Sequence, residues 1–118
     1  MAKILVVDDE QEILIVLKRL LEQEGHEVVL ASDGLEALAI LNETPVDVAF
    51  VDVVMPTVDG LTLMRRMQQD QPRVRIIVMS GFEDVVDLPA RELGLILSLQ
   101  KPFTLDEVQT VLELARTG

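Results

Sequence analysis

The chain has 118 residues, 49% of them hydrophobic but only 3% aromatic, so we expect one domain, residues 1–118, with a core of aliphatic side chains and methionine. Asp and Glu number 21 against 10 Lys and Arg; the net charge of −11 argues against binding to nucleic acid or to an anionic membrane surface. The absence of cysteine excludes disulfides and thiolate metal sites. No apolar run approaches the ~18 residues of a membrane span and no signal peptide is visible, so we expect a cytoplasmic protein.

The first half of the chain alternates strands with helices. Residues 3–7 are predicted to form the first strand, and the apolar run at residues 4–7, without polar alternation, indicates a strand buried on both faces of a parallel sheet. Gly25 is placed to end the helix that follows, whose predicted apolar face carries Ile13, Leu14, Val16, Leu17, Leu20 and Leu21. A short strand over residues 28–31 precedes a capping box at Asp33, which opens a helix through about Leu41.

The second half continues the alternation. A strand over residues 48–51 precedes a helix over about 61–69, and further strands are predicted at 75–79 and 96–99. A second capping box at Thr104 opens the last helix, whose predicted inward residues are Leu105, Val108, Val111, Leu112 and Ala115. Five strands alternating with five helices predict a single α/β domain, a doubly wound five-stranded parallel sheet with helices on both faces.

Polar residues follow these strands at the points where the strands end. Asp8 and Asp9 follow the first strand, Asp52 the third, Ser80 the fourth and Lys101 the fifth. The carboxyl ends of parallel strands share one edge of the sheet, so these groups are expected to converge there. In the alternative interpretation, Asp8 and Asp9 only begin the next helix, where acidic residues suit the positive helix N-terminus.

Converging carboxylates need a proton or a cation. Two like charges ~4 Å apart repel by about 4 kcal/mol at an effective dielectric of 20. Oxygen ligands favour a hard ion such as Mg²⁺, and a serine hydroxyl and a lysine ammonium suit phosphoryl oxygens. A carboxylate beside Mg²⁺ can act as a nucleophile and form an acyl phosphate, and Asp52 is the best candidate because it lies between the other groups in strand order.

With these residues at its strand ends, the chain resembles the receiver domain of the two-component response regulator family. The resemblance rests on motifs at the strand ends and in the loop after the third strand: Val6-Val7-Asp8-Asp9-Glu10, Asp52-Val53-Val54-Met55-Pro56, Gly60, Ser80-Gly81 and Lys101-Pro102-Phe103. It covers essentially the whole chain and implies the flavodoxin-like strand order 2-1-3-4-5.

The resemblance also implies a function and a partner. Asp52 would accept a phosphoryl group from the phosphohistidine of a histidine kinase or from a histidine phosphotransfer protein, and Ser80 and Lys101 would bind that group. The implied Mg²⁺ ligands are Asp9, Asp52 and the backbone carbonyl of Val54, with Asp8 assisting. The Lys101–Pro102 peptide would be cis. Such a chain is a signalling domain rather than a metabolic enzyme; an output domain outside this chain and a homodimer stay open.

The chain departs from the family pattern at two positions. Ser98 stands where the family usually carries the switch aromatic of the fifth strand, and Pro89 would interrupt a fourth helix that began at its usual place. We therefore predict a late, short fourth helix over about residues 88–93. Phe82 is a candidate for the switch role, although it equally suits a simple apolar cover, and apolar residues at Val54 and Phe82 predict slow self-dephosphorylation.

Two other functions stay open. A pseudo-receiver, acting as a constitutive protein-binding module, is favoured by Ser98 and Pro89 and disfavoured by the complete set of site residues. A phosphatase or phosphotransferase of the haloacid-dehalogenase type needs a second acid two residues beyond the nucleophile, and Val54 stands there.

Two remaining residue types have structural interpretations. His26, the only histidine, lies in a polar Glu-Gly-His-Glu segment, and we expect it to be an exposed turn residue. The methionines that follow the third strand are expected to fill the core: Met55, Met64, Met67 and Met79.

Overall fold

The protein is described by a computed structural model that covers residues 1–53, 60–81 and 96–117. One sheet contains five parallel strands in the order β2-β1-β3-β4-β5, which confirms the predicted topology. The strands are β1 (Lys3–Val7), β2 (Glu27–Ala31), β3 (Val48–Asp52), β4 (Arg75–Ser80) and β5 (Ile96–Gln100). Each lies within one or two residues of its predicted range.

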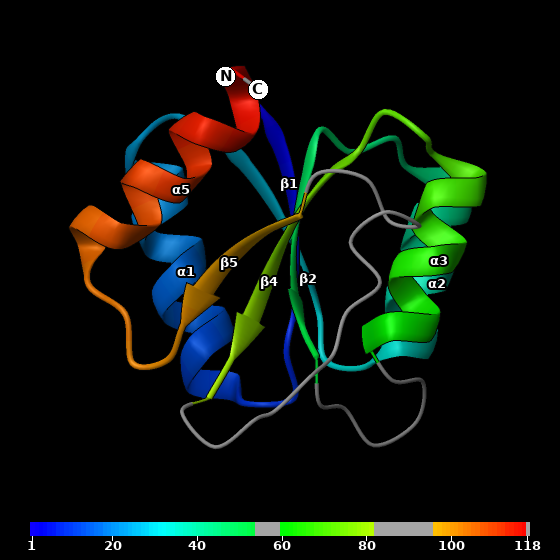
Figure 1. Cartoon of the computed structure of the whole chain (residues 1–118), viewed down its shortest axis with the longest axis horizontal. Helices are drawn as coiled ribbons and strands as arrows, with labels where there is room; N and C mark the ends of the chain where they lie inside the picture. Colours follow the sequence, from blue (N-terminus) through cyan, green and yellow to red (C-terminus); the bar gives the residue numbers. More distant parts are fainter. Residues whose placement is uncertain (54–59, 82–95, 118) are drawn as a thin grey trace.

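Helices cover both faces of the sheet (Figure 1). The described helices are α1 (Gln11–Gln23), α2 (Gly34–Glu43), α3 (Gly60–Asp70) and α5 (Leu105–Thr117). The first and last of them lie on one face, and α2 and α3 lie on the other (Figure 1). The predicted fourth helix over 88–93, with Pro89 and Phe82, lies outside the described residues. No helix in the described ranges has both the length and the apolar character needed to cross a membrane.

The sheet separates two hydrophobic clusters. Successive residues of β1 alternate between them: Leu5 and Val7 contribute to the cluster under α2 and α3, and Ile4 and Val6 to the cluster under α1 and α5. All four side chains are buried, because a strand points successive side chains to opposite faces and both faces are covered here. This arrangement confirms the prediction of a strand buried on both faces.

Two residues predicted to face inward are exposed. In α1 the buried stripe consists of Leu14, Leu17 and Leu21, and Val16 lies outside it, 46% exposed. A residue two positions from Leu14 is turned about 200° from it around the helix axis, so Val16 points away from the buried stripe. Leu105 is 45% exposed because it begins α5, one turn before the first buried residue of that helix. Helical periodicity predicts the side on which a residue lies, but not where along the helix the packing begins.

The predicted helix boundaries depend on short-range contacts that the structure contains. The carboxylate of Asp33 accepts a 2.8 Å hydrogen bond from the Glu36 backbone N–H at the start of α2. At the start of α5, Thr104 and Glu107 form both hydrogen bonds of a capping box, at 3.2 and 3.0 Å. Gly25 follows α1 with a φ of 88°, a conformation that glycine adopts without a steric penalty.

Candidate functional site

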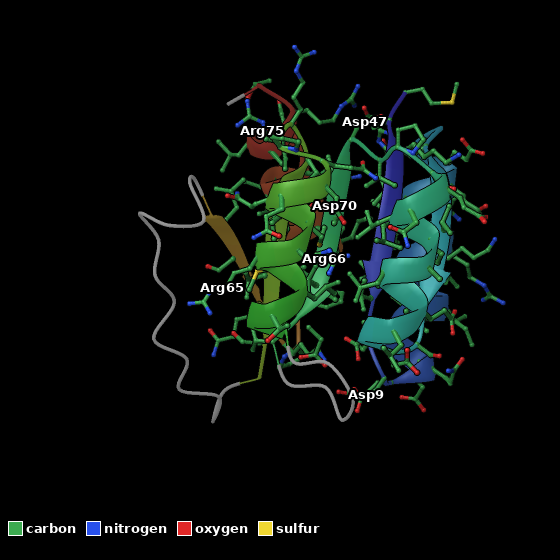
Figure 2. All side chains as sticks on the ribbon, turned by 90° about the vertical axis from the view of Figure 1, so that its right-hand side faces the viewer. Asp9, Asp47, Arg65, Arg66, Asp70 and Arg75 are labelled. Carbon is green, nitrogen blue, oxygen red and sulfur yellow. The ribbon has the colours of Figure 1, made fainter. Side chains whose placement is uncertain are left out.

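The predicted site residues follow strands that end at one edge of the sheet. Asp52 closes β3 and pairs in register with Met79, so Ser80 lies one residue further along β4. Ser80 pairs with Gln100 of β5, and its carbonyl accepts a 2.7 Å hydrogen bond from the Lys101 backbone N–H. Figure 2 shows Asp9 at the end of the molecule opposite to Arg75, which begins β4. Half-buried Ser80 and the site aspartates therefore share the C-terminal edge of the strands.

The ammonium group of Lys101 contacts three carboxylates. Its Nζ atom lies 2.8 Å from Asp8 Oδ2, 3.1 Å from Glu10 Oε1 and 3.4 Å from Asp52 Oδ2. Its side chain is only 13% exposed, and the peptide bond that follows it, Lys101–Pro102, is cis as the resemblance implied. Within the described residues, the ammonium donates hydrogen bonds to Glu10 and Asp52, and its contact with Asp8 Oδ2 is an ion pair without good hydrogen-bond geometry.

Asp8 is a buried carboxylate with an incomplete set of partners. Its backbone N–H donates to Ala31 at 3.1 Å, and its Oδ1 accepts a 2.9 Å hydrogen bond from the Glu10 backbone N–H. Its Oδ2 atom is fully buried and, despite its closeness to Lys101, has no hydrogen-bond partner of good geometry within the described residues. Helix α1 takes Glu10 as its N-cap residue, so Asp8 is not simply the start of that helix.

Burial and charge shift the pKa values of this cluster. Burial raises the pKa of Asp8 above its ordinary value, against the opposing effects of the Lys101 ammonium and the Glu10 N–H. Burial alone would lower the pKa of Lys101, but the contact with Asp8, followed by Glu10 and Asp52, raises it above its ordinary value. The lysine is therefore charged at neutral pH, and Asp8 binds a proton more readily than an exposed aspartate.

The carboxylates fit a hard divalent cation. One oxygen from each of Asp8, Asp9 and Glu10 lies within 4.8 Å of the others. The donors in this set are all oxygens, which Mg²⁺ prefers, and Oδ2 of buried Asp8, although ion-paired with Lys101, accepts no hydrogen bond of good geometry within the described residues. Asp9 is exposed, so the set opens to solvent. The predicted ligand at the Val54 carbonyl lies outside the described residues.

Two residues of the structure were not anticipated from the sequence. The sequence motifs assign no separate role to Glu10, although its position directly after Asp8 and Asp9 indicates that its carboxylate can join their cluster. His26 was expected to be exposed, and that prediction is wrong: it is 8% exposed, and its Nδ1 atom accepts a 3.0 Å hydrogen bond from the Ala2 backbone N–H. The polar residues around it in the sequence gave no sign of this contact, which forms because β1 and β2 lie side by side.

A parallel sheet with an aspartate cluster and a lysine at its C-terminal edge defines a class of signalling domain. The family model for the response regulator receiver domain matches residues 4–113, and the chain belongs to that family. Receiver domains are signalling domains of two-component systems.

Curated relatives include both short and long proteins. Sporulation initiation phosphotransferase F of Bacillus subtilis (strain 168) is 32% identical over 108 residues, which cover 91% of this chain and 87% of that protein. Transcriptional regulatory protein CpxR of Klebsiella pneumoniae subsp. pneumoniae (strain HS11286) is 37% identical over 103 residues, covering 87% of this chain but 44% of that protein. The chain thus spans less than half of the length of this transcriptional regulator.

Solved structures agree with the fold. A response regulator receiver domain protein from Clostridium thermocellum superposes with a TM-score of 0.89 at 34% identity, covering 99% of this chain and 95% of the other. Vibrio cholerae chemotaxis protein CheY4 superposes with a TM-score of 0.84 at 31% identity, covering 98% of each chain.

Proposed function

We propose that this chain is the phosphoacceptor of a two-component phosphorelay and that Asp52 accepts the phosphoryl group. The observation that carries the proposal is the 3.4 Å contact between the Lys101 ammonium and buried Asp52, at the sheet edge that also carries Asp8 and Ser80. A lysine ammonium is a suitable partner for phosphoryl oxygens. Family membership supports the same function.

The transfer step uses side chains that lie at this edge. A carboxylate oxygen of Asp52 attacks the phosphorus of a phosphohistidine, so that an O–P bond forms while the P–N bond breaks and the imidazole leaves. Lys101 neutralises charge on the transferred group, and the Ser80 hydroxyl donates to one of its oxygens. Asp8, Asp9, Asp52 and the Val54 carbonyl would hold Mg²⁺, which supplies further neutralisation of the phosphoryl oxygens.

The partners in this proposal follow from the phosphoryl donor and from the relatives. The donor is a sensor histidine kinase or a histidine phosphotransfer protein. One relative is named a phosphotransferase and another a transcriptional regulatory protein of about twice this length. Phosphorylation would switch the contacts of this domain with a partner or with an output domain.

A second candidate function rests on Ser98. This residue is exposed on β5, and no aromatic ring stands at its position. A pseudo-receiver that binds a partner constitutively, without phosphorylation, would need no switch aromatic. The two candidates differ in whether Asp52 gains a phosphoryl group.

Intact-mass spectrometry after incubation with acetyl phosphate tests this difference. We expect the wild type to gain one phosphoryl group only when Mg²⁺ is present, and Asp52→Ala to gain none. Asp70→Ala is a matched control, because Asp70 is an aspartate on α3 that pairs with exposed Arg66, and it should behave as the wild type. No gain in the wild type under any condition would favour the pseudo-receiver, and a gain in Asp52→Ala would place the phosphoryl group elsewhere.

A further inference from the structure

Glu10 occupies the N-cap position of α1 without capping it. Its backbone carbonyl accepts hydrogen bonds from Ile13 N–H at 3.1 Å and Leu14 N–H at 3.3 Å, but its side chain makes no cap hydrogen bond. Asp, Asn, Ser and Thr are the effective cap residues, and glutamate is not among them. The Glu10 carboxylate turns instead to Lys101, which lies 91 residues further along the chain and 3.1 Å away.

The three carboxylates around Lys101 differ in their freedom to leave. Asp8 is fully buried and held by the Glu10 N–H, and Asp52 is also buried, with its side chain 5% exposed. The Glu10 side chain is 59% exposed, so it can turn into water at little cost. The ammonium donates hydrogen bonds to Glu10 and Asp52 and forms an ion pair with Asp8, so an incoming phosphoryl oxygen competes with anionic groups that already surround the same cation.

We propose that Glu10 is an internal competitor of the phosphoryl group for Lys101, a positioning residue that occupies the ammonium in the unphosphorylated protein and weakens phosphoryl binding. The inference rests on the proposed function of Asp52. A phosphoryl group on Asp52 and the Glu10 carboxylate are both anionic and share one ammonium group, so they oppose each other through charge as well as through occupancy. Glu10→Gln removes the charge and keeps the length of the side chain.

The test uses beryllofluoride, an analogue of the phosphoryl group, at saturating Mg²⁺. ¹⁹F NMR measures the beryllofluoride concentration that half-saturates the wild type, Glu10→Gln and Glu12→Gln. Glu12 is the matched control, because it is an exposed acid in the first turn of the same helix, and its substitution removes one charge from the same helix end. We expect Glu10→Gln to lower the half-saturating concentration roughly two- to fivefold, the range that a partly exposed ion pair provides, and Glu12→Gln to leave it within error.

Salt and metal affinity separate competition from other roles. The effect of Glu10→Gln should shrink at 1 M NaCl, where charges are screened beyond about 3 Å, whereas a purely structural effect would persist. Calorimetric titration with Mg²⁺ alone should give no weaker affinity for Glu10→Gln than for Glu12→Gln. A loss confined to Glu10→Gln would make Glu10 a metal ligand and overturn the inference.

The remaining outcomes distinguish this inference from the proposed function. If the wild type binds beryllofluoride and Glu10→Gln binds it equally or more weakly, Glu10 is not a competitor, and the role of Asp52 is unaffected. If the wild type binds no beryllofluoride, the proposed function fails, and the competition falls with it.

Discussion

At the scale of single residues, Lys101 holds the acidic cluster together. Substitution by Met keeps most of the side chain but leaves buried Asp8 without a counter-ion. Removal of one partner of a buried ion pair is costly, and we expect Lys101→Met to lower the free energy of unfolding by about 2–4 kcal/mol at pH 7. The deficit should shrink as the pH falls, because the raised pKa of Asp8 allows the orphaned carboxyl to take up a proton.

Urea denaturation measures this difference. Lys18→Met is the matched control, since Lys18 pairs with Glu22 on the surface of α1 and should contribute less than about 1 kcal/mol. Equal losses of unfolding free energy in the two variants would show that the Lys101 ammonium does not stabilise the acidic cluster.

We expect buried His26 to make the stability of the fold depend on pH. Burial, followed by the positive charges of Arg116 and the N-terminus, lowers the pKa of His26 below 6.5, and only Glu24 opposes this shift. Because the unfolded chain then binds a proton more readily than the folded one, stability is complete above about pH 6.5 and is lost as the pH falls below that value. Protonation of Nδ1 would also remove the acceptor for the Ala2 N–H.

The contribution of His26 can be measured as the slope of the unfolding free energy against pH. The free energy of unfolding from urea titrations should fall in the wild type between pH 7.5 and 5.5, by at most about 1.4 kcal/mol per pH unit from this one group. His26→Gln keeps an acceptor near Ala2 but cannot titrate, so its curve should be flatter in this window. Parallel curves would exclude His26 as the source.

At the scale of elements, Gln71, directly after α3, connects that helix to the end of α2 and to the segment between α2 and β3. Its Oε1 accepts a 3.0 Å hydrogen bond from Val46 N–H, and its Nε2 donates at 2.9 Å to the carbonyls of both Leu41 and Thr44. Gln71→Leu would leave one backbone donor and two acceptors without these partners, and we expect a loss of about 2–3 kcal/mol. Gln69→Leu, at an exposed position near the end of α3, should change stability by less than about 0.5 kcal/mol.

The experiment compares urea midpoints of these two variants with the wild type. Similar values for Gln71→Leu and Gln69→Leu would mean that water replaces the lost hydrogen bonds and that Gln71 does not fix the α2–β3 connection.

At the scale of the whole molecule, the fold was predictable because its signals are local and repeated. Apolar runs indicate central parallel strands, as at residues 4–7, whose side chains alternate between the two hydrophobic clusters. The capping box at Thr104 indicates the start of a helix. Once the strands are known to be parallel, their C-terminal edge follows, and with it the meeting of Asp8, Asp52 and Lys101.

What could not be predicted depends on contacts between distant parts of the chain. Glu10 looks like any acidic residue before a helix until Lys101 is placed beside it. His26 looks like a turn residue until the pairing of β1 with β2 brings Ala2 against it. Such contacts leave no periodic trace in the sequence, because each is made by one side chain with one distant partner. The roles proposed for all the site residues stay predictions: Asp8, Asp9, Asp52, Ser80, Lys101 and the Val54 carbonyl.

The position of Lys101 after the edge strand β5 has a consequence for synthesis of the protein on the ribosome. The carboxylates of residues 8–10 and Asp52 are synthesised first. Lys101, which pairs with them in the folded protein, follows Glu10 by 91 residues. A nascent sheet of β1, β2 and β3 would therefore carry this acidic edge without Lys101, which we expect to disfavour its early closure. Docking of β5 would bring Lys101 to the carboxylates, so the strand that completes the sheet would also relieve the repulsion at its edge.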